Sequence, residues 1–157
     1  MSRGIYHVPK AYNEPVKDYK PGSPERAELK EMIRKMWSQV IDIPMYIGGK
    51  AIRTEDKRDI HPPHDHQHVL GQYYYGTAGH VHQAIDAALE ARRGWQEMTW
   101  DQRASIFLKA ADLVSGPYRA KINAATMLGQ SKNVFQAEID AACEFADFLR
   151  FNVEFMS

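Results

Sequence analysis

The strongest constraint on the fold is a long helical pattern between positions 118 and 157. Steps of mostly three and four residues separate its apolar positions, which are Val134, Ala137, Ala141, Phe145, Phe148, Leu149, Phe155 and Met156. Such steps mark one face of an α-helix, which has about 3.6 residues per turn. A second apolar set widens that face and consists of Phe135, Ile139, Ala142 and Ala146. More than one neighbour must therefore pack against this helix. Because it stays apolar through Phe155 and Met156, we expect the chain to be the front part of a longer protein.

Composition argues against several classes of partner and location. Twenty basic and twenty acidic residues cancel, so no net charge favours nucleic acid or an anionic membrane, and we predict neither partner. One cysteine, Cys143, cannot form an internal disulfide and fits a reducing compartment. The first residues lack the apolar run of a signal peptide, and no segment approaches the roughly 20 apolar residues that span a bilayer. We therefore expect a soluble, cytoplasmic protein.

Residues 1–22 are predicted to form an extended N-terminal arm that lies on another surface. They show neither helical nor strand periodicity, and their prolines are Pro9, Pro15 and Pro21. The first helix should begin directly afterwards, because Ser23 is a good N-cap and Pro24 suits the first helical position. Its apolar face is predicted to contain Leu29, Met32, Ile33, Met36, Trp37 and Val40.

Three strands are expected after this helix. Alternating apolar residues on both sides of Gly48-Gly49 predict a hairpin, in which the glycines supply the positive φ of the turn. Pro44 places the first of these strands at a sheet edge. A third strand is predicted around His68–Tyr75, whose tyrosines favour extended structure.

Four helices are predicted to close the chain. The first opens at Thr77 or Gly79, and one face of it carries Val81, Ile85, Ala88, Leu89, Arg92 and Trp95. The second opens at Thr99 with Gln102 as its capping-box partner. The third covers residues 117 to about 128, and the fourth is the long apolar helix. The expected order is therefore arm, helix, three strands and four helices.

A histidine cluster offers the first candidate site. On a strand, His64, His66 and His68 would share one face, which could bind zinc or copper together with His61. A solvated polar loop explains the same residues, and no further histidine or cysteine cluster completes a site. We predict that these histidines form no specific metal site.

Cys143 is the second candidate, as a nucleophile. An activated cysteine needs a base, a positive neighbour or a helix N-terminus. Cys143 is expected in the middle of a helix beside Glu144, whose charge would raise the thiol pKa, and so we interpret it as a packing residue.

Three acids of the last helix form the third candidate. Asp140, Glu144 and Asp147 could suggest a metal-binding bundle, but such bundles use Glu-x-x-His pairs and this helix has no histidine. They are predicted to form a solvated face, with Arg150 paired to Asp147 or Glu154. The sequence also lacks G-x-G-x-x-G, a Walker loop and G-x-S-x-G, so patterns alone reveal no complete active site.

Several segments nevertheless resemble one family. They are GSPER, YIGGKAIRT, HPPHDH, FLKAADLVSGPYRA and QAEIDAACEFADFLRFN. From about Asn13 to its end, the chain is similar to the delta-1-pyrroline-5-carboxylate dehydrogenases. These enzymes, also called glutamate-semialdehyde dehydrogenases, are a branch of the aldehyde dehydrogenase superfamily. The last two segments are specific to that branch.

This resemblance implies an α/β, aldehyde-dehydrogenase-like fold. The chain would supply the arm, residues 1–22, and a truncated portion of the cofactor domain, residues 23–157, which is mostly helical with a β-hairpin and one further strand. The complete enzyme would oxidise L-glutamate γ-semialdehyde to L-glutamate with NAD in proline catabolism, as a homo-oligomer. The family's nucleophilic cysteine, general-base glutamate and phosphate-contacting glycines would lie beyond this chain, which alone is predicted to be inactive.

One residue here is tied to the site by the resemblance. Glu144 matches a helix glutamate that borders the aldehyde pocket in this branch, whereas Cys143 does not match the nucleophile motif. A surface carboxylate is the alternative for Glu144. For the whole chain, the alternative is a helical adaptor that binds a protein partner through Phe148, Phe155 and Met156.

Overall fold

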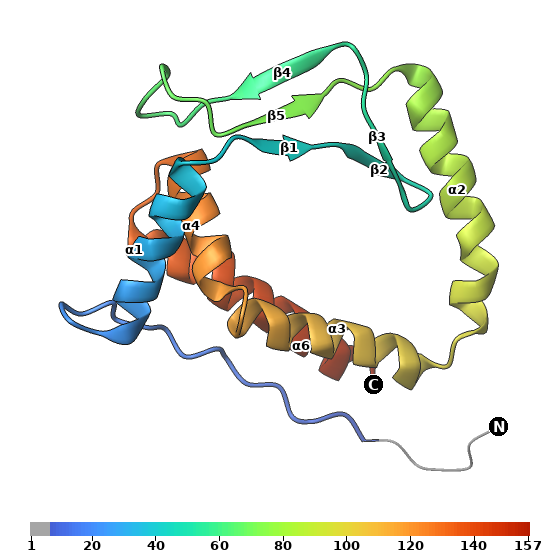
Figure 1. The fold of residues 1–157 in the computed structure, drawn as a ribbon. Coiled ribbons are helices and arrows are strands. Elements are labelled where there is room, and N and C mark those ends of the chain that lie inside the picture. The colour runs from blue at the N-terminus through green and yellow to red at the C-terminus, as the bar shows by residue number, and fades with distance from the viewer. Residues whose placement is uncertain (1–6) are drawn as a thin grey trace.

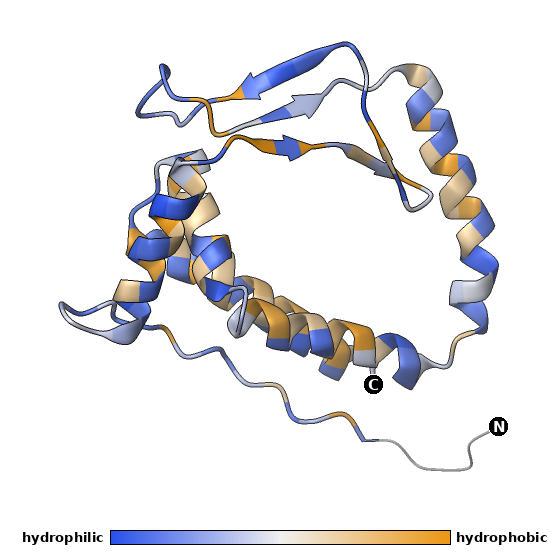
Figure 2. Cartoon of the chain, in the orientation of Figure 1, coloured by the Kyte–Doolittle hydropathy of each residue, from blue (hydrophilic) through white to orange (hydrophobic). Residues whose placement is uncertain are grey.

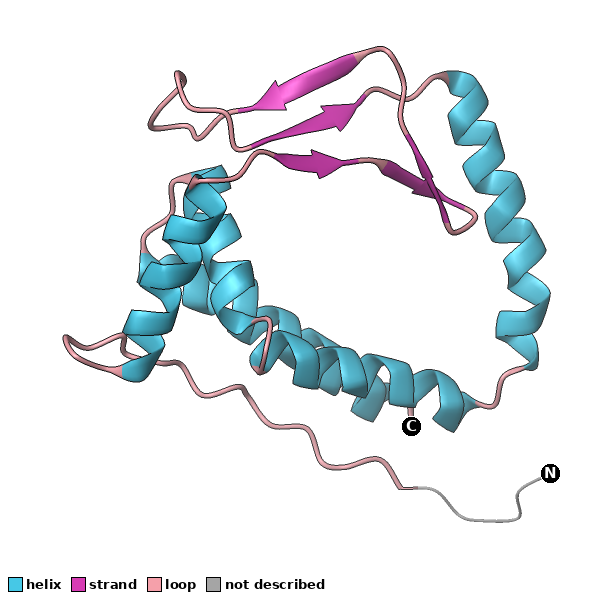
Figure 3. Ribbon diagram, viewed as in Figure 1, coloured by secondary structure: helices cyan, strands magenta, loops and turns pink. Residues whose placement is uncertain are grey.

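The computed structural model describes residues 7–157, which form a helical body and two small sheets (Figures 1 and 3). The elements of this described part are, in chain order, α1 (Pro24–Trp37), β1 (Ile41–Ile43), β2 (Met45–Ile47), β3 (Lys50–Ile52), β4 (Lys57–Ile60), β5 (Gly71–Tyr74), α2 (Ala78–Glu97), α3 (Trp100–Ser115), α4 (Arg119–Gln130), α5 (Val134–Ala137), the π-helix η1 (Glu138–Cys143) and α6 (Glu144–Met156). The predicted arm contains neither helix nor strand over residues 7–20, and its residues 1–6 lie outside the described residues.

The elements follow one another around a ring in Figure 1. α1 packs against α4, and α3 packs along α6. The strands lie across the ring from α3 and α6, and α2 connects β5 to α3 at the right of the view. The arm runs back beside α6, which brings residues 11–17 next to the last helical run (Figure 1).

The sheets contain the predicted hairpin and two strands that the sequence patterns missed. β2 and β3 pair antiparallel, and Gly48 and Gly49 turn between them with φ of 56° and 76°. In the other sheet, β5 lies between β1, to which it is parallel, and β4, to which it is antiparallel. β1 alternates Ile-Asp-Ile but has only three residues, and β4 has one apolar residue among four, so neither strand gives a strong sequence signal. The described part thus has five strands where three were predicted.

The helix boundaries agree well with the capping signals. The Ser23 side chain accepts a bond from Arg26 N–H at the start of α1, with Pro24 in the first turn. α3 begins after Thr99, whose N–H donates to the Gln102 side chain. α4 extends two residues past the expected end, because Ser131 adopts the left-handed conformation that closes a helix.

The long last helix was predicted as a regular α-helix, but it is interrupted. α5, η1 and α6 form one continuous helical run, and the six residues of η1 have the wider π geometry. Apolar periodicity does not report such an insertion, because the positions on both sides keep their spacing of three and four. π turns of this kind often mark functional sites.

The core is small and lies where helices meet. Tyr19, Leu29 and Ala124 form a buried cluster, against which partly buried residues of α1 and α4 pack. In contrast, α2 has no fully buried residue within the described structure, and its apolar residues Val81 and Leu89 are exposed. Orange bands along α2 in Figure 2 mark its hydrophobic residues. The described helices include none that is long and apolar enough to cross a membrane.

Candidate functional site

Carboxylates of the last helix fasten the arm. Among the described residues, three of them accept backbone N–H groups of the arm. The pairs are Lys17 with Glu138 at 2.8 Å, Glu14 with Asp147 at 2.6 Å and Ala11 with Glu154 at 2.8 Å. We call these three bonds the arm clamp. An extended segment outside a sheet has no backbone partners of its own, so the clamp satisfies donors that would otherwise need water.

Glu138 is the most deeply buried member of the arm clamp, with no exposed surface. It also accepts bonds from Tyr19 Oη and Asn123 Nδ2, both at 2.7 Å, and forms an ion pair with Arg119. Burial alone would raise the pKa of Glu138, but the bonds from Arg119, Lys17 N–H, Tyr19 and Asn123 hold this pKa below its ordinary value. The carboxylate is therefore charged at neutral pH.

A second carboxylate, that of Glu14, pairs with the guanidinium groups near Glu138. Glu14, on the arm, pairs with both Arg119 and Arg150, and its Oε2 accepts from Arg150 Nη1 at 2.8 Å. Arg150 also donates to Ser115 Oγ at 3.2 Å. The cluster thus contains the carboxylates of Glu14 and Glu138 and two guanidinium groups, with Asp147 at its edge, 3.9 Å from Arg150 Nη1. The arm supplies Glu14. Because buried charges are stable only when paired, the arm completes the interior of this protein.

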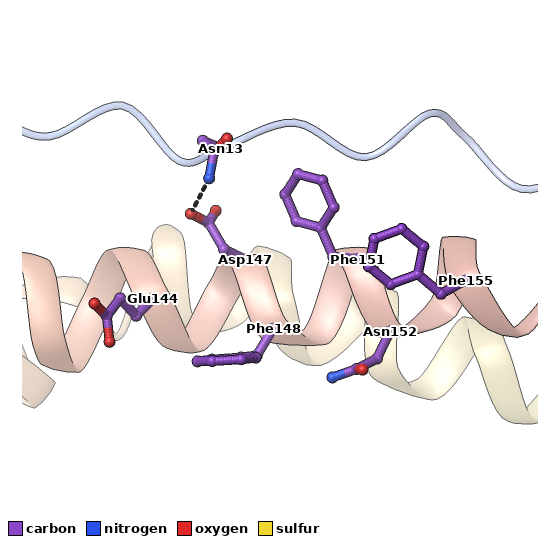
Figure 4. Close-up of a pocket in the computed structure, with 7 residues that line it drawn as sticks. All are labelled: Asn13, Glu144, Asp147, Phe148, Phe151, Asn152 and Phe155. Carbon is purple, nitrogen blue, oxygen red and sulfur yellow. Dashed lines mark hydrogen bonds between the residues drawn. The ribbon is translucent and has the colours of Figure 1, made fainter.

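A pocket of about 360 Å³ lies where the arm passes α6. The residues that line it are Asn13, Glu144, Asp147, Phe148, Phe151, Asn152 and Phe155. Asn13 Nδ2 donates to Asp147 Oδ2 at 2.8 Å across the top of the pocket (Figure 4). In this view Asp147 and Phe151 point toward the arm, whereas Phe148 points away from it. The pocket combines an aromatic surface with carboxylates at one end, which suits a small organic molecule that carries polar groups.

Comparison with known proteins identifies the family. The family model described as "Aldehyde dehydrogenase family" matches residues 51–157, which is more than half of the chain. The chain belongs to the aldehyde dehydrogenase family. The predicted aldehyde-dehydrogenase-like fold is therefore confirmed, although the prediction of a single strand beyond the hairpin was too low.

Two relatives within this family are similar to most of this chain. The chain is 49% identical over 152 residues to "Delta-1-pyrroline-5-carboxylate dehydrogenase" of Agaricus bisporus, an alignment that covers 96% of this chain and 28% of the relative. It is 46% identical over 142 residues to the Danio rerio protein whose name adds "mitochondrial", with coverage of 90% and 26%. The chain thus spans little more than a quarter of the length of these relatives, and the resemblance to this branch is confirmed.

A solved structure extends the likeness to three dimensions. The Delta-pyrroline-5-carboxylate dehydrogenase of Mycobacterium tuberculosis bound with NAD shares 46% of its residues with this chain in the aligned region. The TM-score is 0.96, and the match covers 99% of this chain and 29% of the other. Almost every described element therefore has a counterpart in an aldehyde dehydrogenase.

The acids of the last helix do not all behave as predicted. Glu144 is exposed and lines the pocket, and Asp140 is exposed and pairs with Lys132 at 2.6 Å. Asp147 was assigned to the same solvated face, and this is wrong: it is half-buried and binds the arm. The expected ion pair between Arg150 and Asp147 is present at 3.9 Å, but the closer partner of Arg150 is Glu14 at 2.8 Å. Helical spacing could not reveal a partner on a distant segment.

Cys143 is the packing residue that the sequence indicated. Its thiol is buried, and burial, followed by the nearby charge of Glu138, raises its pKa to about 11. Arg119 Nη2 lies 3.4 Å from the sulfur and lowers the pKa in part. The thiol stays protonated at neutral pH and is a poor nucleophile.

The histidine cluster has no shared strand face. His61, His64, His66 and His68 all precede β5 in an irregular segment. His68 stacks on Trp37 with 3.8 Å between ring centroids, and His64 Nδ1 lies 2.6 Å from Ser131 Oγ. Over residues 7–157 no group of three or more metal-binding side chains occurs. That these histidines bind no metal stays a prediction.

The sequence analysis missed the buried cluster altogether. For Glu138 a signal was present, because Val134, Ala141 and Ala142 surround it on its own side of the helix. A carboxylate within an apolar helix face predicts a buried cationic partner, because an unpaired charge is costly to bury. Arg119 gave no such signal, since its partner Glu14 is 105 positions away.

Two glycine-containing connections differ from the loops that bind dinucleotide phosphates. Phosphate-binding loops lead from a strand into a helix N-terminus through glycines. Here Gly48 and Gly49 turn within a hairpin, and the connection from β5 to α2 ends in a cap where Thr77 N–H donates to His80 Nδ1 at 3.0 Å. These residues do not fit the phosphates of NAD.

Proposed function

We propose that this chain is part of an NAD-dependent dehydrogenase that oxidises L-glutamate γ-semialdehyde to L-glutamate in proline catabolism. The observation that carries the proposal is the 49% identity to the Agaricus bisporus relative over 96% of this chain. Residues 1–22 serve as the arm and residues 23–157 as part of the cofactor domain. The alternative role as a helical adaptor receives no support from the comparisons.

In this proposal Glu144 borders the aldehyde pocket of the complete enzyme. Its exposed carboxylate lies in the pocket beside an aromatic surface that includes Phe148 and Phe155. The semialdehyde carries a charged amino-acid end on a short apolar chain. A carboxylate next to aromatic rings suits both parts of such a molecule, so Glu144 orients the substrate without transferring a proton.

The chemical step requires groups outside the described residues. Cys143 is buried with a raised pKa, so we assign the nucleophile to another segment of the complete enzyme. We assign the NAD phosphates to another segment as well, because the Gly48-Gly49 turn and the Thr77 cap do not fit them. NAD is proposed as the cofactor because the Mycobacterium tuberculosis relative is bound with it. We further propose that the complete enzyme is a homo-oligomer, which sedimentation would test. We also propose a cytoplasmic location. Cell fractionation should distinguish it from the mitochondrial location that the name of the Danio rerio relative indicates for that protein.

The test compares the complete enzyme with the 157-residue chain. Each is incubated with glutamate semialdehyde and NAD, and formation of NADH is followed by absorbance. The complete enzyme should turn over and should prefer this semialdehyde to unsubstituted aldehydes of similar length. The 157-residue chain should give no turnover above a heat-inactivated control. A complete enzyme without this activity would contradict the proposal.

A further inference from the structure

The arm clamp and the pocket lie on neighbouring stripes of α6. Glu144, Phe148 and Phe155 follow one another at steps of four and seven residues and line the pocket. Asp147 and Glu154, which hold the arm, are seven residues apart on the adjacent stripe, and Asp147 also lines the pocket. The arm is therefore held along the edge of the pocket.

The spacing of the arm matches that of the helix. Its bonded N–H groups recur every third residue, from Ala11 to Glu14 to Lys17. In an extended, polyproline-like segment every third N–H faces the same side, at a rise of about 9 Å. The step from Asp147 to Glu154 rises about 10.5 Å along an α-helix and turns it almost twice. Asp147 and Glu154 can therefore accept hydrogen bonds from two successive N–H groups on the same side of the extended arm, those of Glu14 and Ala11.

The π-helix brings the third carboxylate onto this side. Each residue of an α-helix turns it by about 100°, so the nine residues from Glu138 to Asp147 would turn it about 900° and direct the two side chains to opposite sides. The wider turn of η1 takes up about one extra residue and reduces the offset to about 80°. Glu138 can then reach Lys17 N–H while remaining in the buried cluster with Arg119.

The arm also contributes a wall to the pocket. Asn13 lies between two clamped residues and lines the pocket opposite Glu144. A carboxylate only accepts hydrogen bonds, so Asp147 fixes the Asn13 amide with its Nδ2 inward. The backbone bond from Glu14 holds the same carboxylate in place at 2.6 Å.

We propose that the arm is a positioning element of the substrate pocket, in which Asn13 and Asp147 set the distance between the arm and Glu144. This inference rests on the proposed function and adds to it a role for residues outside the cofactor domain. Releasing the arm near Asn13 removes one wall of the pocket, so it weakens substrate binding. Chemistry and NAD binding depend on other segments and should change little.

The test uses the complete enzyme with the variants Asn13→Asp and Asn13→Ser. Asn13→Asp places a second carboxylate against Asp147, and repulsion should raise KM for glutamate semialdehyde about tenfold, equivalent to losing one charge-assisted hydrogen bond. kcat and KM for NAD should stay within about twofold, which a general loss of folding would not produce. Asn13→Ser keeps a donor and should restore part of the affinity. Val16→Ala, an exposed arm residue outside the arm clamp, is the matched control and should behave like wild type.

A second measurement covers the case in which Asn13→Asp folds poorly. Ala11→Pro removes the N–H that binds Glu154 and leaves every pocket side chain in place. It should raise KM less than Asn13→Asp, with faster hydrogen exchange in the arm. If hydrogen exchange in the arm becomes faster while KM is unchanged in an active enzyme, this inference is overturned and the proposed function stands. The same holds if KM rises and kcat falls by equal factors. A wild-type enzyme that does not oxidise the semialdehyde overturns the proposed function and this inference with it.

Discussion

Replacing Glu138 by glutamine should release the arm, because it removes the charge that faces Arg119. Glu14 and Glu138 face two guanidinium groups in this cluster, and Asp147 lies 3.9 Å from Arg150. Among the described residues, the variant leaves Arg119, which is 4% exposed, with Glu14 as its one carboxylate partner, and Arg150 shares that partner. Breaking a buried ion pair in this way costs about 3–5 kcal/mol. Since a folded domain has only about 5–15 kcal/mol of stability, the arm should open before the helical body unfolds.

Hydrogen exchange of the Lys17 amide measures this opening, since that N–H donates to Glu138. A loss of about 3 kcal/mol accelerates exchange about 150-fold. Asp140→Asn is the matched control, because Asp140 lies two residues further on, is exposed and pairs with Lys132. It should change exchange by less than about threefold. The double variant Glu138→Gln with Arg119→Met removes both charges and should recover much of the protection. If Glu138→Gln exchanged within threefold of wild type, the argument from buried charge would be refuted.

Three further predictions concern the pocket, the histidines and acid. Glu144→Ala in the complete enzyme should raise KM for the semialdehyde more than KM for NAD, and should shift the free energy of unfolding by no more than about 0.5 kcal/mol. The control Asp140→Ala should leave every kinetic constant unchanged. If the two variants had the same kinetic constants, the assignment of Glu144 to the substrate pocket would be wrong. Calorimetric titration with zinc should show weak binding at most, and submicromolar affinity that disappears in His64→Ala with His66→Ala would contradict us. The lowered pKa of Glu138 makes its stabilising contribution complete above the unfolded-state pKa, about 4.3, and lost as the pH falls through the lower folded-state value. Pepsin should therefore cut the arm faster as the pH falls below about 4, after correction for its rate on an unfolded substrate at each pH. Glu138→Gln should show a smaller increase, because Asp147 and Glu154 still hold the arm.

The sequence predicted what local chemistry decides. Caps such as Ser23 and Thr99 fixed helix starts, because a side chain and the N–H groups it satisfies lie within one turn. The glycine pair Gly48-Gly49 fixed the hairpin for the same reason. Glu144 was assigned to the pocket by resemblance alone, and it lines a pocket in the structure, but its contact with substrate stays a prediction.

What the sequence missed depends on distant partners. β1 and β4 exist because β5 pairs with both, and their own residues carry little periodic signal. The role of Asp147 depends on Glu14, which is 133 positions earlier. A pattern within the helix could therefore assign Asp147 only to solvent. The π-helix was invisible for a similar reason, since what it achieves is the approach of Glu138 to the arm.

The arm clamp also has a consequence for the order in which the chain folds. Ala11 and Glu154 are 143 positions apart, and at about 5–20 residues per second the ribosome completes Glu154 roughly 7–30 s after Ala11. Bringing such distant residues together carries a loop-closure cost that no local contact repays. The arm leaves the ribosome before the helices that hold it and is therefore among the last of these segments to be fixed, and Arg119 must stay hydrated until Glu14 binds it.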